Sequence, residues 1–134
     1  MIIASTQTLE HLLRNLDPVL NDGVYVYAST QSNAIGYVDC LASMRESEGV
    51  TVITTPFEAK RAGLKTHFEA AWITLKINSD LHAVGLTAAF SGALARAGIS
   101  CNVIAGVHHD HLFVPYDQAA NAMACLRQLQ SDPR

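Results

Sequence analysis

Residues 72–115 read WITLKINSDLHAVGLTAAFSGALARAGISCNVIAGVHHDHLFVP, and this stretch decides the fold that the sequence predicts. Residues 72–78 alternate between two faces, which is the pattern of a half-buried strand. The apolar face of that strand carries Ile73, Leu75 and Ile77. The stretch therefore begins with a strand that has one side against a core.

A helix and two more strands follow this first strand. The helix has apolar residues on one face at helical spacing, namely Leu86, Phe90, Leu94 and Ala97. Gly98 suits the position just after a helix C-terminus. Strands over residues 99–105 and 111–114 form a hairpin, and a last helix capped by Asp117 completes the order β-α-β-β-α.

The first half of the chain predicts a looser version of the same unit. Thr6 or Thr8 is placed to cap a helix with a leucine stripe on one face. Residues 24–29 and 50–54 are predicted strands, and Pro56 fits the first position of a helix that Gly63 ends.

The segments between these elements carry weaker signals. We expect a polar loop over residues 30–37, a charged turn over 45–49 and a connection over 64–71. Residues 38–44 fit either a short helix or an irregular strand.

Both halves have the element order of the split β-α-β motif. The predicted fold class is therefore α+β, with two ferredoxin-like βαββαβ modules, the first degenerate, whose helices pack on an antiparallel sheet. The second half has no recognisable closing strand, so that strand is absent, or comes from another segment such as residues 1–5, or comes from another chain. Because a bare sheet edge invites pairing, we expect the two halves to share a sheet or the protein to form a homodimer or higher homo-oligomer.

Composition and charge exclude several classes of protein. The 134 residues include 49% hydrophobic and 16% charged side chains, which is apolar enough to fold. The formal charge of −3 gives no reason to expect a nucleic-acid partner, since such proteins carry basic patches. No apolar run reaches the roughly 18 residues of a membrane span, and the N-terminus has no signal-peptide pattern. Three widely spaced cysteines without a CxxC motif predict reduced thiols in a cytoplasmic protein.

Four segments, NSDLHAVGLTAAFSGALARAGISCNVIAG, HHDHLFVP, GVYVYAST and RESEGVTVI, resemble the ACT-domain proteins. Within that family, the chain is similar to short bacterial proteins with paired ACT-like modules. The resemblance implies a degenerate N-terminal ACT-like module over residues 1–66 and a C-terminal one over 67–134. It also implies a regulatory or sensor protein that binds an amino acid or similar small effector where two modules or subunits meet.

The resemblance also implies where a ligand binds. The family's ligand loop joins the first strand to the first helix, which corresponds here to residues 78–86, and its second strand, here residues 100–105, supplies the opposite wall. The ligand-binding residues implied in this way are Asn78, Ser79, Asp80, Val84, Gly85, Leu86, Asn102 and Val103.

The chemistry of these residues supports two interpretations. Free N–H groups at a helix start can hold a ligand carboxylate, and Asp80 can pair with an ammonium group. Ser79 and Asp80 can equally be plain helix caps. Asn102 lies in an apolar strand, where a buried amide needs a partner, which is either a ligand or a neighbouring loop.

A histidine-rich cluster raises the question of a metal site. His108, His109, Asp110 and His111 are of metal-ligand type, with His82 as a more distant candidate. Adjacent residues of a strand point to opposite faces, so the four cannot hold one ion without an irregular turn. A polar hairpin tip is the plainer interpretation, and we expect no metal and no cofactor.

No sequence motif of a hydrolase, a P-loop protein or a dinucleotide-binding enzyme occurs, and apolar neighbours favour an inert thiol at Cys101. We therefore expect a non-enzymatic sensor of a small molecule. Two alternatives remain open, which are a ligand-free interaction or structural module and, less favoured, a His-based metal-binding protein.

Overall fold

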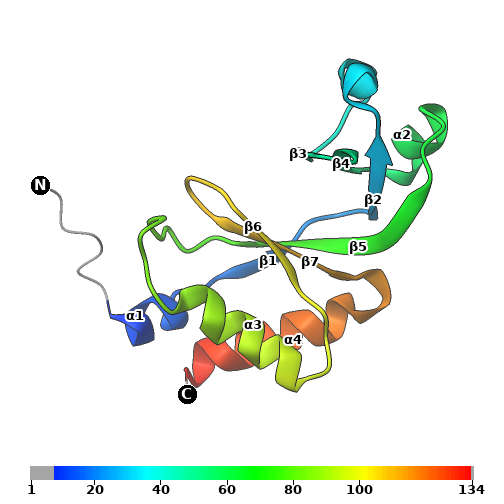
Figure 1. Ribbon diagram of the computed structural model, residues 1–134. Helices are drawn as coiled ribbons and strands as arrows, with labels where there is room; N and C mark the ends of the chain where they lie inside the picture. Colours follow the sequence, from blue (N-terminus) through cyan, green and yellow to red (C-terminus); the bar gives the residue numbers. More distant parts are fainter. Residues whose placement is uncertain (1–7, 134) are drawn as a thin grey trace, which may run out of the picture.

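A computed structural model of the protein describes residues 8–133, so the strand proposed over residues 1–5 lies outside the described range. The elements in chain order are α1 (Leu9–Arg14), β1 (Pro18–Leu20), β2 (Tyr25–Thr30), the 3-10 helix η1 (Ser32–Tyr37), β3 (Ala42–Glu46), β4 (Gly49–Thr54), α2 (Pro56–Arg61), β5 (Thr66–Leu75), α3 (Leu86–Arg96), β6 (Asn102–Ala105), β7 (Asp110–Pro115), the 3-10 helix η2 (Tyr116–Gln118) and α4 (Ala119–Ser131). Within this range, seven strands form one antiparallel sheet in the order β3-β4-β2-β5-β7-β6, and β1 also pairs with β5 (Figure 1).

Two ferredoxin-like modules share strand β5, which confirms the predicted fold class. The first module consists of β2, η1, β3, β4, α2 and the first half of β5, and its strands lie in the order β3-β4-β2-β5. Its first helix is reduced to the 3-10 helix η1, so this module is the degenerate one. The second module runs from the second half of β5 through α3, β6, β7 and α4.

The closing strand of the second module is β1, which precedes that module in the chain. β1 pairs antiparallel with the end of β5, with Pro18 opposite Leu75 and Leu20 opposite Ile73. The spatial order β1-β5-β7-β6 is thereby completed by a segment of the same chain. The sequence shows no sign of this strand because three residues that begin with a proline are too short for an alternating pattern.

Strand β5 is longer at its start and shorter at its end than predicted. Residues 66–71, expected to be a connection, already belong to β5 and pair with β2 and β7. The strand ends at Leu75 rather than Asn78, because the backbone N–H groups of Lys76 and Ile77 donate to the carbonyls of Asp17 and Leu16 at 3.0 and 3.2 Å. Leu16 and Asp17, in the segment between α1 and β1, thus accept the backbone hydrogen bonds at this end of β5.

Other segments of the first module differ from prediction in the same way. The expected polar loop over residues 30–37 contains the last residue of β2 and the whole of η1. The ambiguous segment 38–44 ends in strand β3, which also takes in Arg45 and Glu46 and leaves only residues 47–48 as the turn to β4. These charged residues were expected in a turn, but an exposed edge strand accommodates them equally well.

Helix boundaries follow the predicted caps in the first half and depart from them in the second. The hydroxyl of Thr8 caps α1 by accepting from His11 N at 3.1 Å, and Pro56 is the first residue of α2. Asp117 does not cap the last helix, because it lies within η2 and α4 begins only at Ala119.

Within residues 8–133, the helices all lie against one face of the sheet, and an aromatic cluster occupies the other. Helices α1, α3 and α4 cover β1, β5, β7 and β6 (Figure 1). This core contains fully buried side chains, among them Phe90, Leu16, Ile73, Leu75, Leu94, Leu112, Val114 and Leu126. Ala97, predicted on the same face of α3, is exposed because the helix has ended there.

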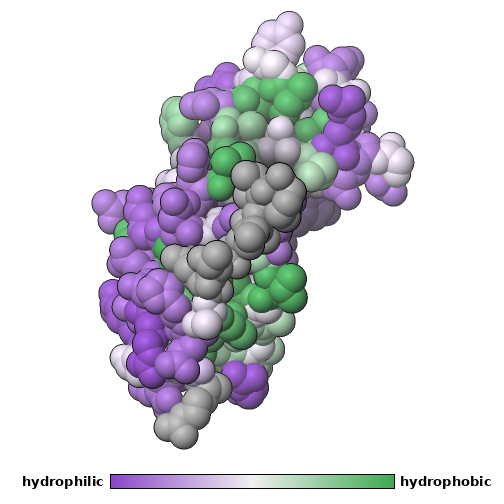
Figure 2. Space-filling model, turned by 90° about the vertical axis from the view of Figure 1, so that its left-hand side faces the viewer, coloured by the Kyte–Doolittle hydropathy of each residue, from purple (hydrophilic) through white to green (hydrophobic). Residues whose placement is uncertain are grey.

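The opposite, helix-free face carries rings from β2, β5 and β7. Tyr27 meets Phe68 and Phe113 edge-on, with ring centroids 5.6 and 5.8 Å apart, and Trp72 stacks on Phe113 at 6.4 Å. Figure 2 shows the two modules as an upper and a lower lobe, each with some hydrophobic surface. No helix within residues 8–133 is both long enough and apolar enough to span a membrane.

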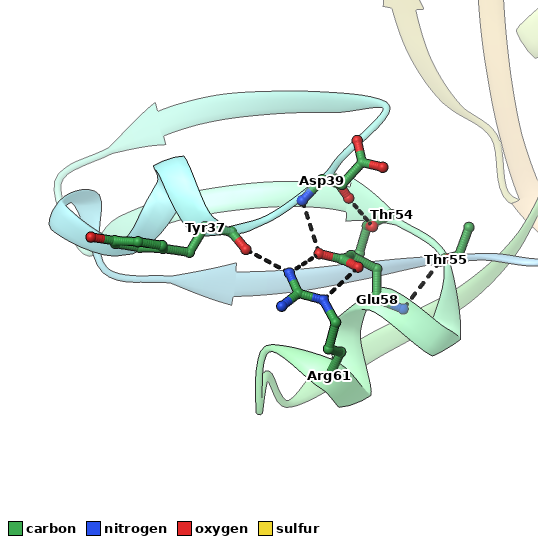
Figure 3. A network of polar contacts seen from close by, with 6 residues as sticks. All are labelled: Tyr37, Asp39, Thr54, Thr55, Glu58 and Arg61. Atoms are coloured by element: carbon green, nitrogen blue, oxygen red, sulfur yellow. Dashed lines mark hydrogen bonds and ion pairs between the residues drawn. The ribbon is translucent and has the colours of Figure 1, made fainter.

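A polar clamp holds the segment before β3 against α2 (Figure 3). The Glu58 carboxylate accepts from Asp39 N at 3.0 Å and from two nitrogens of Arg61, whose guanidinium also donates to the carbonyl of Tyr37 at 2.7 Å. These donors, with the Arg61 hydrogen bond first, lower the pKa of Glu58 from its ordinary 4.5 to about 2. The clamp therefore fixes the position of one edge of the sheet.

Replacing Phe90 by alanine should destabilise the protein by about 3–5 kcal/mol, since it removes a fully buried ring from the helix-covered core. Phe57→Ala is the matched control, because that ring is 76% exposed and its loss should change stability by less than ~0.5 kcal/mol. Urea unfolding of both variants measures this difference. Equal costs would contradict the assignment of the core.

The lowered pKa of Glu58 predicts a pH-dependent stability. The carboxylate's contribution is fully present above its ordinary pKa of 4.5 and is lost as the pH falls toward about 2. Glu58→Gln should therefore be less stable than the wild type at neutral pH and show a shallower loss of stability between these two pH values. Glu48→Gln, in the exposed β3–β4 turn, is the control; an acid profile for Glu58→Gln as steep as that of the wild type would argue against the clamp.

Candidate functional site

The candidate site lies on the helix-free face of the sheet, where residues of both modules face each other. Along β6, Val103 packs against the helix-covered core, so its neighbours Asn102 and Ile104 lie on the opposite face. Residues of β3 and β4 approach from the first module. The two ends of the sheet, β3 and β6, thus contribute to one hollow.

This hollow has a volume of about 320 Å³ and is lined by Tyr27, Ala42, Ser43, Met44, Thr51, Ile53, Asn102, Val103 and Ile104. A smaller hollow of about 130 Å³ adjoins it and shares Ala42 and Ile104. Its other lining residues are Leu41, Trp72, His111 and Phe113. We call the two hollows together the inter-module groove.

The groove is apolar with a few polar groups, and its titratable side chains are held neutral. Burial, with a smaller contribution from Cys101, raises the pKa of Tyr27 to about 12. Burial is also the main cause of the lowered pKa of His111, to which His109 and Lys76 add. None of the described residues lining the groove is Asp, Glu, Lys or Arg.

Hydrogen bonds fix the orientation of His111 at the floor of the groove. The indole Nε1 of Trp72 donates to His111 Nδ1 at 3.1 Å, and Thr74 Oγ1 lies 3.2 Å from the same nitrogen. A neutral imidazole that accepts at Nδ1 carries its proton on Nε2. Asn21 Nδ2 extends the network by donating to Thr74 Oγ1 at 2.9 Å.

The environment of Asn102 differs from the one that the sequence predicts. The residue is exposed at the margin of the groove rather than buried, and its Nδ2 donates to the carbonyl of Phe113 at 3.4 Å, near the limit for a hydrogen bond. The sheet edge leaves this side chain accessible, since β6 pairs only with β7 among the described strands. Most of its hydrogen-bonding capacity therefore remains available.

The predicted ligand loop lies at the opposite end of the second module from Asn102. Asn78, Asp80 and Val84 are exposed, Ser79 and Gly85 are half-buried, and Leu86 is buried. The carboxylate of Asp80 accepts from the backbone of His82 within the loop, so neither Ser79 nor Asp80 caps α3.

Gly85 occupies the N-cap position of α3 without a side-chain cap. Its φ of 98° lies in the left-handed region that favours glycine. A Cβ there would lie 3.4 Å from Leu9 Cδ2, so α1 covers this side of the loop. The backbone N–H groups at the start of α3 thus have no side-chain cap, as a ligand at this site would require. Helix α1, however, covers one side of the loop, so a ligand could not reach these groups from that side.

One chain does not bring the loop and the Asn102 wall together. Asn102 pairs with Phe113 and lies level with Trp72, whereas the loop starts beyond Leu75, three residues further along β5. With a rise of about 3.3 Å per residue and strands about 4.8 Å apart, the two regions are more than roughly 10 Å apart. Of the predicted ligand residues, only Asn102 and Val103 border the inter-module groove, and of these Val103 turns its side chain into the helix-covered core, so Asn102 supplies the side chain.

Only part of the histidine cluster lies in the turn between β6 and β7, namely His108 and His109, because Asp110 and His111 belong to β7. His108 and His109 have ring centroids 6.3 Å apart, and His109 Nδ1 lies 3.4 Å from the Ile77 carbonyl. His111 instead faces the groove. Across the part of the chain that the structure describes, no three His, Cys, Asp or Glu side chains gather in a way that could hold a metal ion.

Sequence reasoning missed the groove residues of the first module. Tyr27, Ala42, Met44 and Ile53 belong to strands whose alternation was visible in part, but only the curl of the sheet places them opposite β6. The alternation of Tyr25 and Tyr27 was the one signal in the sequence for a helix-free aromatic face.

Comparisons with known proteins agree with this architecture. Two family profiles described as ACT domain match residues 4–71 and 67–128, and their overlap lies in β5, the strand that the modules share. A protein of unknown function from Vibrio cholerae, described as a possible transport protein, is 40% identical, with 91% of this chain and 95% of that chain covered and a TM-score of 0.81. A comparison with curated proteins gave no match.

More distant structures share the fold alone. An Agrobacterium tumefaciens protein is 14% identical, with a TM-score of 0.67 and coverage of 85% of this chain and 88% of that one. The regulatory subunit of aspartate kinase from Thermus flavus is 12% identical, with a TM-score of 0.62 and coverage of 84% and 95%. The two profiles, which together match most of the chain, show that it belongs to the ACT-domain family, with two ACT-type domains in succession.

Proposed function

We propose that this ACT-domain protein is a non-enzymatic regulatory or sensor protein that binds an amino acid or similar small metabolite in the inter-module groove. The observation that supports this best is the position of the groove. It lies where the two modules meet, and it is bordered by Asn102 and Val103, which the family resemblance had implied as ligand residues. Its volume of about 320 Å³ is at the lower end of the range for small-molecule sites.

The composition of the groove also suits such a ligand. Small-molecule sites are mostly apolar, with a few polar groups that fix orientation. Here the aromatic cluster supplies the apolar floor, while the Asn102 amide and the Thr51 hydroxyl lie on opposite walls. A ligand bound between them would contact both modules and fix one relative to the other, which is the physical basis of a sensor.

The remaining predicted ligand residues, from Asn78 to Leu86, lie outside the groove of their own chain. They contribute to a ligand site in this proposal only where a second copy of the chain packs against them. The exposed apolar side chains around the loop, Leu81, Val84 and Val107, are 65%, 90% and 73% exposed and would be covered by a homodimer or higher homo-oligomer. We retain a cytoplasmic location and a module boundary between residues 66 and 67 as parts of the same proposal, with the boundary at the start of the shared strand β5 and with β1 supplied to the second module from the segment before it.

A ligand-free interaction module is the second candidate. Among the described strands, β3 and β6 each have one unpaired edge, and such edges pair readily with another chain. In that case assembly, and not effector binding, would be the function. A protein whose oligomeric state depends on these edges, and which no small molecule stabilises, would favour this candidate.

Thermal unfolding with each common amino acid at millimolar concentration tests the proposed function. At least one should raise the unfolding temperature, because a ligand at ten times its Kd adds about 1.4 kcal/mol to the stability of the native state. Asn102→Leu should lose this response while keeping the ligand-free unfolding temperature, since the side chain is exposed and its hydrogen bond is long.

Asn121→Leu is the matched control for that substitution. It makes the same change at an exposed position of α4, outside both the groove and the predicted ligand loop, and should keep the response to ligand. Loss of the response in Asn78→Leu alone would move the site to the loop. Absence of stabilisation by any amino acid would contradict the proposed function.

A further inference from the structure

We infer that the inter-module groove selects amino acids whose side chain is uncharged and apolar, either branched aliphatic or aromatic. This inference rests on the proposed function and adds the chemical class of the effector. It depends on where the apolar and polar groups of the groove lie, as opposed to its volume alone.

The floor of the groove offers no partner to a charged side chain. The smaller hollow is closed by the rings of Trp72 and Phe113 and by the aliphatic side chains of Leu41 and Ile104. Its single titratable group is His111, whose Nδ1 already accepts the Trp72 proton. Placing an ammonium or carboxylate group among these residues costs several kcal/mol unless it is paired, so a charged ligand side chain is rejected there.

The charged ends of an amino acid have partners at the margin instead. In β3, Glu46 has the same parity as Ala42 and Met44, so it lies on the groove side of the sheet. Its carboxylate accepts from Thr51, a residue that lines the groove. Glu46 is exposed and can pair with the ligand's ammonium group.

The opposite margin suits the ligand's carboxylate. Asn102 Nδ2 is engaged only in the 3.4 Å contact with the Phe113 carbonyl, and the outer edge of β6 has no strand paired to it within residues 8–133. An amide and backbone N–H groups are ordinary partners for a carboxylate. The α-amino and α-carboxyl groups are therefore held at the rim, and the side chain points to the aromatic floor.

The Glu46 carboxylate adds a further selection by charge. It attracts the ammonium group that every amino acid carries, but it repels a second carboxylate in an acidic side chain. A basic side chain would be attracted to the rim but excluded from the floor. Both kinds of charged amino acid are thus expected to bind less well than apolar ones.

Binding of leucine and phenylalanine, compared with aspartate and lysine, tests this selection. Leucine or phenylalanine should raise the unfolding temperature of the wild-type protein and give saturable heat in calorimetry, while aspartate and lysine at the same concentration should not. Stabilisation by aspartate or lysine equal to that by the apolar amino acids would overturn the inference and leave the proposed function standing. No response to any amino acid would instead overturn both.

A pair of matched variants places the selection in the groove. Ile104→Asp puts a carboxylate at the floor and should weaken binding of the apolar amino acid by about tenfold or more, because the bound ligand would bury that charge without a partner. Ile104 is 37% exposed, so this variant is expected to fold. Phe57→Asp puts a carboxylate in place of an exposed apolar side chain on α2, outside both the groove and the predicted ligand loop, and should leave binding unchanged; Ile104→Leu should also retain it. Equal binding by Ile104→Asp and Phe57→Asp would overturn the inference.

Discussion

Both modules depend on the pairing of one strand, β5. Its first half hydrogen-bonds to β2 and closes the first module, and its second half lies between β1 and β7 and opens the second. Since the same ten residues belong to both modules of one continuous sheet, neither module can lose this strand without breaking the other. The two profile matches overlap within β5 for the same reason.

The continuity of β5 also explains where a site can form. A continuous antiparallel sheet twists, and with all helices on one face the other face is left to curl on itself. That curl brings the end strands β3 and β6 to a common hollow over the aromatic cluster of Tyr27, Trp72 and Phe113. The clamp between Glu58 and Arg61 holds the segment that leads into β3, so one wall of the hollow has a fixed position. A ligand bound between the walls would therefore fix the position of one module relative to the other.

Much of this architecture could be predicted from local pattern. The alternation in residues 72–78, the stripe of Leu86, Phe90 and Leu94, and the glycine at position 98 placed the second module, and the family resemblance placed both. Pairing across long sequence distances could not be predicted. Strand β1 has three residues and no periodicity, and the end of β5 is set by the hydrogen bonds that Leu16 and Asp17 accept. Asn102 was found for its chemistry, but its partners across the groove come from strands some 50–75 residues earlier in the chain.

The central claim is that an effector binds between the modules, and the single tryptophan of the chain reports on that place. Trp72 lines the smaller hollow, within hydrogen-bonding distance of His111. Titration with the amino acid that most stabilises the protein, followed by intrinsic fluorescence, therefore measures occupation of the groove. The account predicts a saturable change in Trp72 emission with the same Kd as the thermal stabilisation. Stabilisation by a ligand that leaves Trp72 emission unchanged would contradict it.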